Sequence, residues 1–217
     1  MIQCFVKQPL PPDLAAAKQP RLLYVSKIDT RLSDLPRVMH RHDDLVEIIL
    51  ICKGQGQYSI DGHQVKVRAG DLVIYNSGII HDEITPPDSQ LAWFCVALTG
   101  VQEKGLRQNA LVSDSGRPIF PSGDLFDCMR DTCELMLDQL AHERPGHVVT
   151  THYMLQALLN QARLVINRGA GAMDSSSFDE PLAQRVISYL DGHYTEPISL
   201  QDLSATFNVS AYYLAHV

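Results

Sequence analysis

The sequence predicts an α+β chain in which a sandwich or barrel of about eight short strands is followed by helices. Short apolar runs broken by turn residues fill residues 21–98, and apolar positions recur every three to four residues after residue 123. Of the 217 residues, 45% are hydrophobic and 20% are charged. This balance suits a globular chain with a buried core and excludes a disordered or collagen-like chain.

Composition shifts divide the chain into five segments. Residues 8–20 contain four prolines and little periodic pattern, so an irregular arm is expected there. A small, polar, glycine- and serine-rich stretch marks a linker before the last segment. The expected segments are an arm (1–20), a strand-rich unit (21–122), a helical hairpin (123–168), the linker (169–177) and a short helical module (178–217).

Turn residues separate the expected strands. Asp61-Gly62 between two strand-like runs is a strong hairpin signal, and the Gly54 and Gly70 regions are further turn signals. The expected strands are Leu22–Ile28, Val38–His40, Val46–Cys52, Gln57–Ile60, His63–Val67, Leu72–Tyr75, Asp82–Thr85 and Leu91–Leu98.

Two amphipathic helices are expected next, over 123–143 and 147–168, and they can pair as an antiparallel hairpin. The second helix carries an apolar stripe that is wider than one facing helix needs, which favours a homodimer built on this helix. The alternative is that the first helix and the strand-rich unit cover the whole stripe. The stripe consists of Leu155, Leu158, Leu159, Ala162 and Val165.

The last segment has the rhythm of a helix, a short turn and a second helix. A helix is expected over Pro181–His193. Ser199 is the expected N-cap of the next helix, with Asp202 three residues on in a partial capping box. Ser210 can cap a further helix that begins at Ala211.

Charge and cysteine content limit the possible partners. The net charge is −7, so any DNA binding must come from a local element rather than from overall charge. Residues 178–217 hold a single basic side chain, Arg185, which leaves too few phosphate contacts for measurable affinity. The five cysteines are scattered without a CxxC pair, which favours reduced thiols. No signal peptide or membrane-spanning run is visible, so we expect a cytoplasmic protein without a membrane partner.

A cluster of potential metal ligands lies in the strand-rich unit. His40-x-His42 is followed by Glu47, and Gly70 is followed by Asn76-x-Gly78-x-x-His81. Imidazole nitrogens and a carboxylate suit divalent iron, manganese, nickel or zinc. Two residues apart on a strand, His40 and His42 are expected to project from the same face. A carboxylate within an apolar strand requires a cation, a donor or a raised pKa.

These residues resemble the two signatures of the cupin superfamily. The match comprises His40, His42, Glu47 and Gly54 in the first signature and Gly70, Gly78 and His81 in the second. Asp34, Asn76 and Thr85 depart from it. The resemblance implies a cupin-like barrel (double-stranded β-helix) whose four metal positions are filled here. A bound metal, a polar lining for an organic ligand, and histidines hydrogen-bonded within the barrel mouth all remain open. Tyr75 or Trp93 is expected to stack on such a ligand.

The run from Ile198 to Val217 resembles the first helix-turn-helix of AraC-type transcription regulators, whose pattern is close to I-S-L-x-x-L-A-x-x-x-x-x-S-x-x-Y-L. Ser204 stands where that family usually has Ala. The order of sensor, helical hairpin, linker and this motif is also the family's arrangement. The resemblance implies a ligand-responsive DNA-binding regulator, of which this chain is mainly the effector-binding and dimerisation part. The DNA-facing positions it implies are Ser210, Ala211, Tyr212 and His216.

The resemblance also implies a small-molecule effector and, in a full-length protein, promoter DNA as partners. Only one of the family's two helix-turn-helix units is present here. We therefore expect no working DNA binder from this chain alone, and no catalysis. The alternative function is a metal-dependent cupin enzyme, an oxygenase or isomerase, that uses the three histidines and Glu47. A stand-alone cupin enzyme does not need the C-terminal motif.

Overall fold

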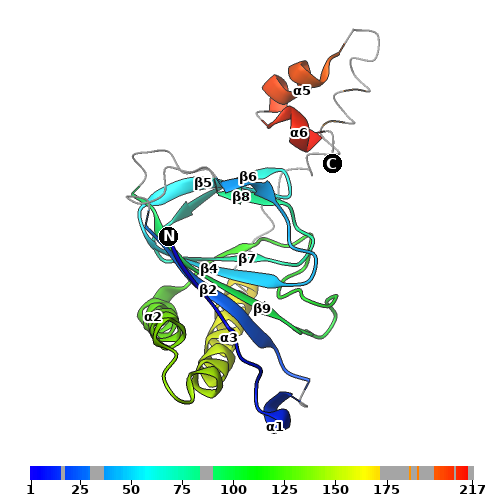
Figure 1. The fold of residues 1–217 in the computed structure, drawn as a ribbon. Coiled ribbons are helices and arrows are strands. Elements are labelled where there is room, and N and C mark those ends of the chain that lie inside the picture. The colour runs from blue at the N-terminus through cyan, green and yellow to red at the C-terminus, as the bar shows by residue number, and fades with distance from the viewer. Residues whose placement is uncertain are drawn as a thin grey trace.

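Two antiparallel sheets lie face to face, and a helical hairpin covers the outer side of the larger one (Figure 1). The computed structural model describes residues 1–15, 18–29, 37–83, 90–171, 186, 190, 198–207 and 209–214. The six-stranded sheet has the order β1-β2-β9-β4-β7-β10, and the four-stranded sheet has the order β3-β8-β5-β6.

The strands follow the apolar runs of the sequence closely. Most of the predicted strands have bounds within one or two residues of those found, and Thr85, the predicted end of one strand, lies outside the described residues. Two short strands, β1 and β10, and the short helix α1 were missed. The strands are β1 (Ile2–Phe5), β2 (Arg21–Asp29), β3 (Arg37–His40), β4 (Val46–Lys53), β5 (Gln55–Ile60), β6 (His63–Arg68), β7 (Asp71–Tyr75), β8 (His81–Glu83), β9 (Ala92–Thr99) and β10 (Ile119–Pro121), and α1 spans Pro12–Ala15.

Alternation along β4 separates two hydrophobic cores. Ile48 and Leu50 belong to the core between the larger sheet and the helices. Ile49 and Ile51 belong to the core that contains residues of both sheets. Because side chains alternate along a strand, Glu47 shares the face of Ile49 and Ile51 and points between the sheets.

The hairpin consists of η2 (Gly123–Leu125), α2 (Phe126–His142) and α3 (His147–Gly171). Glu143 ends α2 in the left-handed conformation, with φ of 46°. Helix α3 continues past the predicted end at Arg168, into the first residues of the expected linker. Within the described residues, no helix is long and apolar enough to cross a membrane.

The apolar stripe of α3 is buried inside one chain. Each of its five members is at most 2% exposed and belongs to the core beneath the larger sheet. The stripe therefore cannot form the surface for a homodimer, and that basis for the dimer prediction was wrong. The sheet and α2 absorb its whole width, which is the alternative that the sequence left open. The members are Leu155, Leu158, Leu159, Ala162 and Val165.

The C-terminal module contains α5 (Leu200–Phe207) and α6 (Ala211–Leu214). The predicted capping box is confirmed: the Ser199 N–H donates to Asp202 Oδ2 (2.9 Å), and the Asp202 N–H donates to Ser199 Oγ (3.2 Å). Most of the helix predicted over 181–193, the rest of the linker and His216 lie outside the described residues.

Asn76, which replaces the proline of the cupin signature, anchors the loop after β9. Its buried amide donates to the Val112 carbonyl (2.8 Å) and to Asp114 Oδ1 (2.9 Å), and its oxygen accepts from the Leu111 N–H (2.9 Å). We expect Asn76→Ala to lower the free energy of unfolding by about 2–4 kcal/mol, because it leaves buried backbone groups unpaired. Urea denaturation measures this loss.

The control is Ser115→Ala in the same loop, where the exposed hydroxyl interacts with Ser113 and its removal costs less than about 0.5 kcal/mol. Equal stabilities of the two variants would contradict the anchoring role of Asn76.

Candidate ligand and metal site

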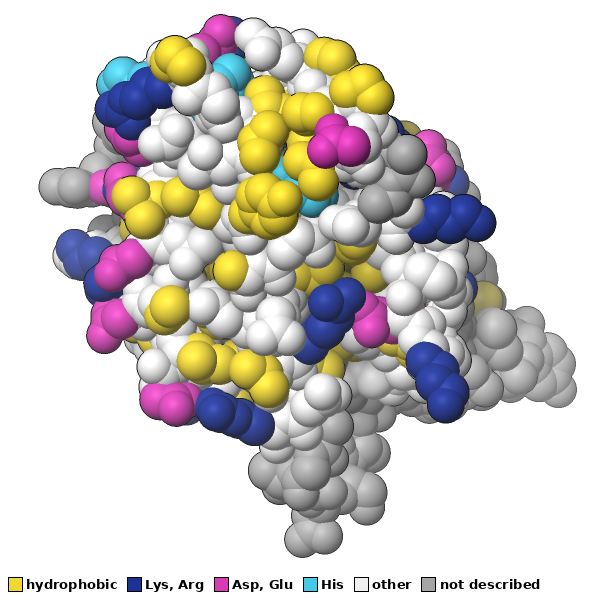
Figure 2. Space-filling model, turned by 90° about the horizontal axis from the view of Figure 1, so that it is seen from below, with side chains coloured by type: hydrophobic (Ala, Val, Ile, Leu, Met, Phe, Trp, Pro, Cys, Tyr) yellow, Lys and Arg dark blue, Asp and Glu magenta, His cyan; other side chains and the backbone are white. Residues whose placement is uncertain are grey.

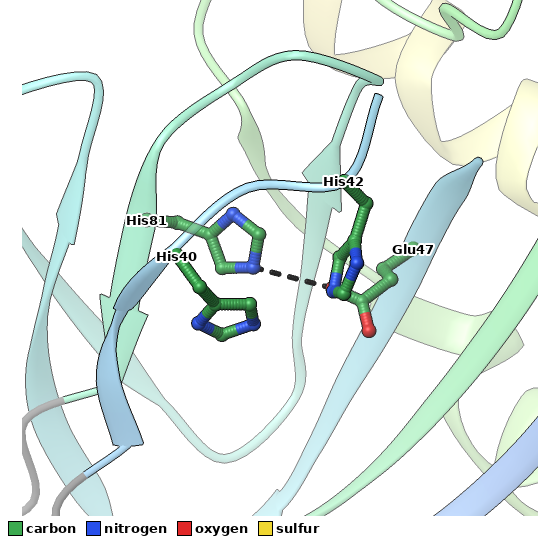
Figure 3. Close-up of side chains that lie close together, drawn as sticks. All are labelled: His40, His42, Glu47 and His81. Atoms are coloured by element: carbon green, nitrogen blue, oxygen red, sulfur yellow. Dashed lines mark ion pairs between the residues drawn. The ribbon is translucent and has the colours of Figure 1, made fainter. Parts of the chain in front are cut away.

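Three histidines and one glutamate converge between the two sheets (Figure 3). One ligand atom from each of His40, His42, Glu47 and His81 lies within 4.8 Å of the others. His40 ends β3 and is the register partner of His81, which begins β8. The two signature segments of the sequence therefore form one site, which we call the histidine–glutamate cluster.

His42 reaches the cluster from a loop rather than from a strand. Strand β3 ends at His40, so strand alternation does not place His42. Its carbonyl instead accepts a hydrogen bond from the Gly78 N–H (2.6 Å). Gly78 has φ of 76°, a conformation that glycine adopts without strain. The glycine of the second signature thereby fixes a histidine of the first.

Glu47 presents its two carboxylate oxygens to different partners. Oε1 accepts from the Tyr24 hydroxyl (2.6 Å) and the Cys95 thiol (3.1 Å). Oε2 lies 3.2 Å from His81 Nε2 and 3.7 Å from His42 Nε2. Two donors thus orient the carboxylate so that its second oxygen faces the imidazoles.

His81 is oriented for ligation. Its Nδ1 lies 3.0 Å from the Ile79 carbonyl, which can only accept, so Nδ1 carries a hydrogen. In the neutral ring, Nε2 then offers its lone pair to the cluster, as a metal-binding histidine does. This buried Nε2 has no hydrogen-bond partner within the described part of the chain. An ion at the cluster would satisfy it, so the residues fit a divalent metal.

The aromatic residues expected at the site differ in position. The Tyr75 ring stacks on the His81 ring, with centroids 3.8 Å apart, and is itself buried. Trp93 packs edge-on against Tyr58 in the core between the sheets, with centroids 6.2 Å apart. Tyr75 therefore supports a cluster residue, whereas Trp93 belongs to the core behind it.

The opening above the cluster is bordered by a strand that the sequence did not predict. A cavity of about 360 Å³ is lined by residues of β1 and β2 together with His40, His42 and Glu47. The arm expected to be irregular thus supplies a wall through β1. The other lining residues are Met1, which precedes β1, Gln3 of β1, and Tyr24 and Ser26 of β2.

Burial acts to raise the pKa of Glu47. When the His81 ring is protonated and its Nε2–H donates to Oε2, its hydrogen bond and charge, with the Tyr24 and Cys95 donors, outweigh burial and lower the pKa of Glu47 to about 2. The folded pKa lies below the unfolded one, so ionised Glu47 stabilises the fold above about pH 5, and this contribution is lost as the pH falls toward 2. The shift corresponds to about 3 kcal/mol. We expect the free energy of unfolding of the Glu47→Gln variant to fall less than that of the unaltered protein as the pH is lowered, because the variant has no carboxylate to protonate at this position.

Urea denaturation of both proteins between pH 7 and pH 2.5 measures the difference. Parallel stability curves would contradict an ionised, stabilising Glu47.

Paired antiparallel sheets that enclose a histidine–glutamate cluster define a cupin-like domain. A family model described as the AraC-like ligand binding domain matches residues 23–156, more than half of the chain. This chain belongs to that family.

Individual relatives are distant. The chain is 23% identical over 181 residues to the uncharacterized HTH-type transcriptional regulator YdiP of Escherichia coli K12, covering 82% of this chain and 59% of the relative. It therefore spans about three fifths of that protein's length. The solved structure of an apo ToxT variant from Vibrio cholerae is 11% identical in sequence. The match covers 90% of this chain and 73% of the ToxT chain, with a TM-score of 0.43. A cupin protein from Bacteroides fragilis is 20% identical. The match covers 50% of this chain and 97% of the cupin chain, with a TM-score of 0.32.

Proposed function

We propose that this chain is the sensing part of a ligand-responsive, DNA-binding transcription regulator of the AraC type, and that its effector is a divalent transition-metal ion. One observation carries the choice of effector: three imidazoles converge on an ionised carboxylate, with all four ligand atoms within 4.8 Å. Family membership and the similarity to a transcriptional regulator support the regulatory role.

The chemistry of the cluster favours an ion over an organic effector. Three imidazole nitrogens and one carboxylate oxygen suit iron, manganese, nickel or zinc. When bound, the ion would supply positive charge between Glu47 Oε2 and the histidines. Tyr24 and Cys95 would keep Glu47 Oε1 away from it, because they already donate to that oxygen. We propose sensing in the cytoplasm, and not catalysis, because the family is one of regulators.

The C-terminal module lies next to the cluster. Val209 of this module is buried in a small apolar group with Phe207 and Leu214, and Met39 and Ile80 pack against it. Met39 and Ile80 directly precede His40 and His81. Neighbouring side chains on an extended backbone point to opposite sides. Binding of an ion by His40 and His81 would therefore move Met39 and Ile80, which contact the module from the other side. This contact is the proposed route from effector to DNA reader.

The proposed DNA contacts are at the start of α6. Tyr212 is 71% exposed and so is accessible to DNA, and Ser210 is also exposed. Ala211 is half-buried, and His216 lies outside the described residues. Promoter DNA is the proposed partner of the longer protein that contains both helix-turn-helix units.

Elemental analysis tests the effector. Protein purified without a metal-affinity column, then incubated with zinc, nickel, manganese or iron and desalted, is expected to retain about one equivalent of one metal. Glu47→Gln is expected to retain much less. Retention well below one equivalent in the unaltered protein would instead favour an organic effector held by polar side chains.

Hydrogen exchange tests the route to the module. Addition of the retained metal is expected to change exchange in β3, at Ile80 and over 198–214, whereas the Met39→Ala variant shows the change at β3 only. An unaltered exchange rate over 198–214 in the metal-bound protein would contradict the route.

We also propose a homodimer that uses the outer face of α3. Tyr153, Ala157 and Leu164 are exposed at helical spacing, and Tyr153 and Leu164 are 59% and 43% exposed. Figure 2, a view from the side of the helices, shows hydrophobic side chains among charged ones. Sedimentation equilibrium at micromolar concentration is expected to give a dimer that Leu164→Glu converts to monomer. A monomeric unaltered protein would refute this proposal.

A further inference from the structure

A second cavity lies outside the space between the sheets. It has a volume of about 310 Å³ and is formed by the N-terminal segment, the start of β2 and the first turns of α3. Its size falls at the lower end of small-molecule sites, and, like them, it combines apolar walls with a few polar groups. The apolar walls include Val6, Leu10, Leu22 and Val148.

His152 supplies a buried acceptor in this cavity. The side chain is 2% exposed, and its Nε2 lies 3.2 Å from Gln19 Oε1, an oxygen that can only accept. Nε2 therefore carries the hydrogen. Burial lowers the pKa of His152, which favours the neutral ring at pH 7. Nδ1 is then a lone-pair acceptor. It has no hydrogen-bond partner among the residues that the structure describes.

A buried acceptor of this kind requires a donor. Gln156, one turn further along α3, directs its Nε2 to the Pro20 carbonyl (3.0 Å) and forms no hydrogen bond with His152 Nδ1. The Thr151 hydroxyl, which also lines the cavity, donates back to its own helix, to the His147 carbonyl at 2.8 Å. A hydroxyl on a bound molecule would satisfy Nδ1.

Arg21 adds a cation at the same cavity. It lines the cavity, is exposed, and forms no ion pair with any described residue. A guanidinium at the rim of an apolar pocket suits a carboxylate. We propose that this cavity, which we call the α3 cavity, binds a small hydroxylated carboxylic acid with an apolar body: the body contacts the apolar walls, the hydroxyl donates to His152 Nδ1, and the carboxylate pairs with Arg21.

The α3 cavity is separate from the histidine–glutamate cluster, but the two share strands. Gln3 and Tyr24 line the opening above the cluster, whereas Val6 and Leu22 line the α3 cavity. Strand β1 and the residues that follow it therefore connect the two sites. The acid would act as a second effector of the proposed regulator.

Calorimetric titration of this chain with two probes tests the site. 4-Hydroxyphenylacetate is expected to bind with a Kd of about 0.1–1 mM, and phenylacetate, which lacks the hydroxyl, about tenfold more weakly. In His152→Phe the two probes are expected to bind equally. The ratio of the two dissociation constants isolates the hydroxyl contact, because a general loss of packing would weaken the binding of both probes alike.

Arg21→Gln, a change at an exposed position, provides an independent variant that is expected to fold. It is expected to weaken both acids about tenfold and to leave the neutral 4-hydroxyphenylacetamide unaffected. Ser115→Ala, a change at an exposed loop hydroxyl, is the control and should bind both acids as the unaltered protein does. Two results would each overturn the proposal: no binding of 4-hydroxyphenylacetate at 10 mM, or an unchanged probe ratio in His152→Phe.

Discussion

Replacement of His81 by Asn is expected to lower the affinity of the protein for the proposed transition-metal effector by about 10²–10³-fold. Apparent binding free energies of four-ligand zinc sites are about 10–16 kcal/mol, so one ligand of four is worth roughly 3–4 kcal/mol. His81 is 1% exposed, and its ring is already set by the Ile79 carbonyl and the Tyr75 ring. No rearrangement is then needed to bring its Nε2 to the ion.

Competition against a chelating indicator, with zinc as the probe metal, measures this loss. His142→Asn is the matched control, because His142 is an exposed histidine of α2 whose Nδ1 lies near the Asp138 carbonyl. It should leave the affinity unchanged. An affinity of His81→Asn within threefold of the unaltered protein would exclude His81 as a ligand.

Leu159→Ala is expected to lower the free energy of unfolding by about 3–4 kcal/mol, which is typical for a leucine removed from a close-packed core. Leu159 is fully buried in the core between the larger sheet and the hairpin. Leu164→Ala, five residues along α3 and 43% exposed, should change the stability of the monomer by less than about 0.5 kcal/mol. Urea denaturation compares the two, and equal losses would contradict the assignment of the inner and outer faces of α3.

Local sequence signals were sufficient for most of the elements. Asp61-Gly62 predicts the β5–β6 hairpin, and both residues have positive φ, 48° and 77°, as a tight two-residue turn of that type requires. Ser199 and Asp202 likewise predict the start of α5. These signals depend on residues within a few positions of one another, so the sequence contains them directly.

The partners of Glu47 depend on strand order, which local patterns do not specify. Tyr24 and Cys95 lie 23 and 48 positions away along the chain. They meet Glu47 because β9 lies between β2 and β4 in the sheet. The motif spacing could indicate the four cluster residues, but neither donor belongs to a motif.

The sequence did not determine whether the α3 stripe is buried within one chain, for a similar reason. Periodicity shows that Leu155 and Leu159 share a face with Ala162, but it does not show how much of that face the sheet covers. The order of the larger sheet, with β9 and β4 at its centre, gives the hairpin a broad apolar surface to pack on. That width follows from long-range pairing and became visible only in the fold.

Anomalous diffraction from crystals of this chain grown with zinc or nickel tests the central claim most directly. The expected result is one strong peak between the sheets, about 2.0–2.2 Å from a nitrogen of each of His40, His42 and His81 and from one oxygen of Glu47. A map without a peak among these four side chains, or with peaks only elsewhere on the molecule, would contradict the assignment of a metal effector to this site.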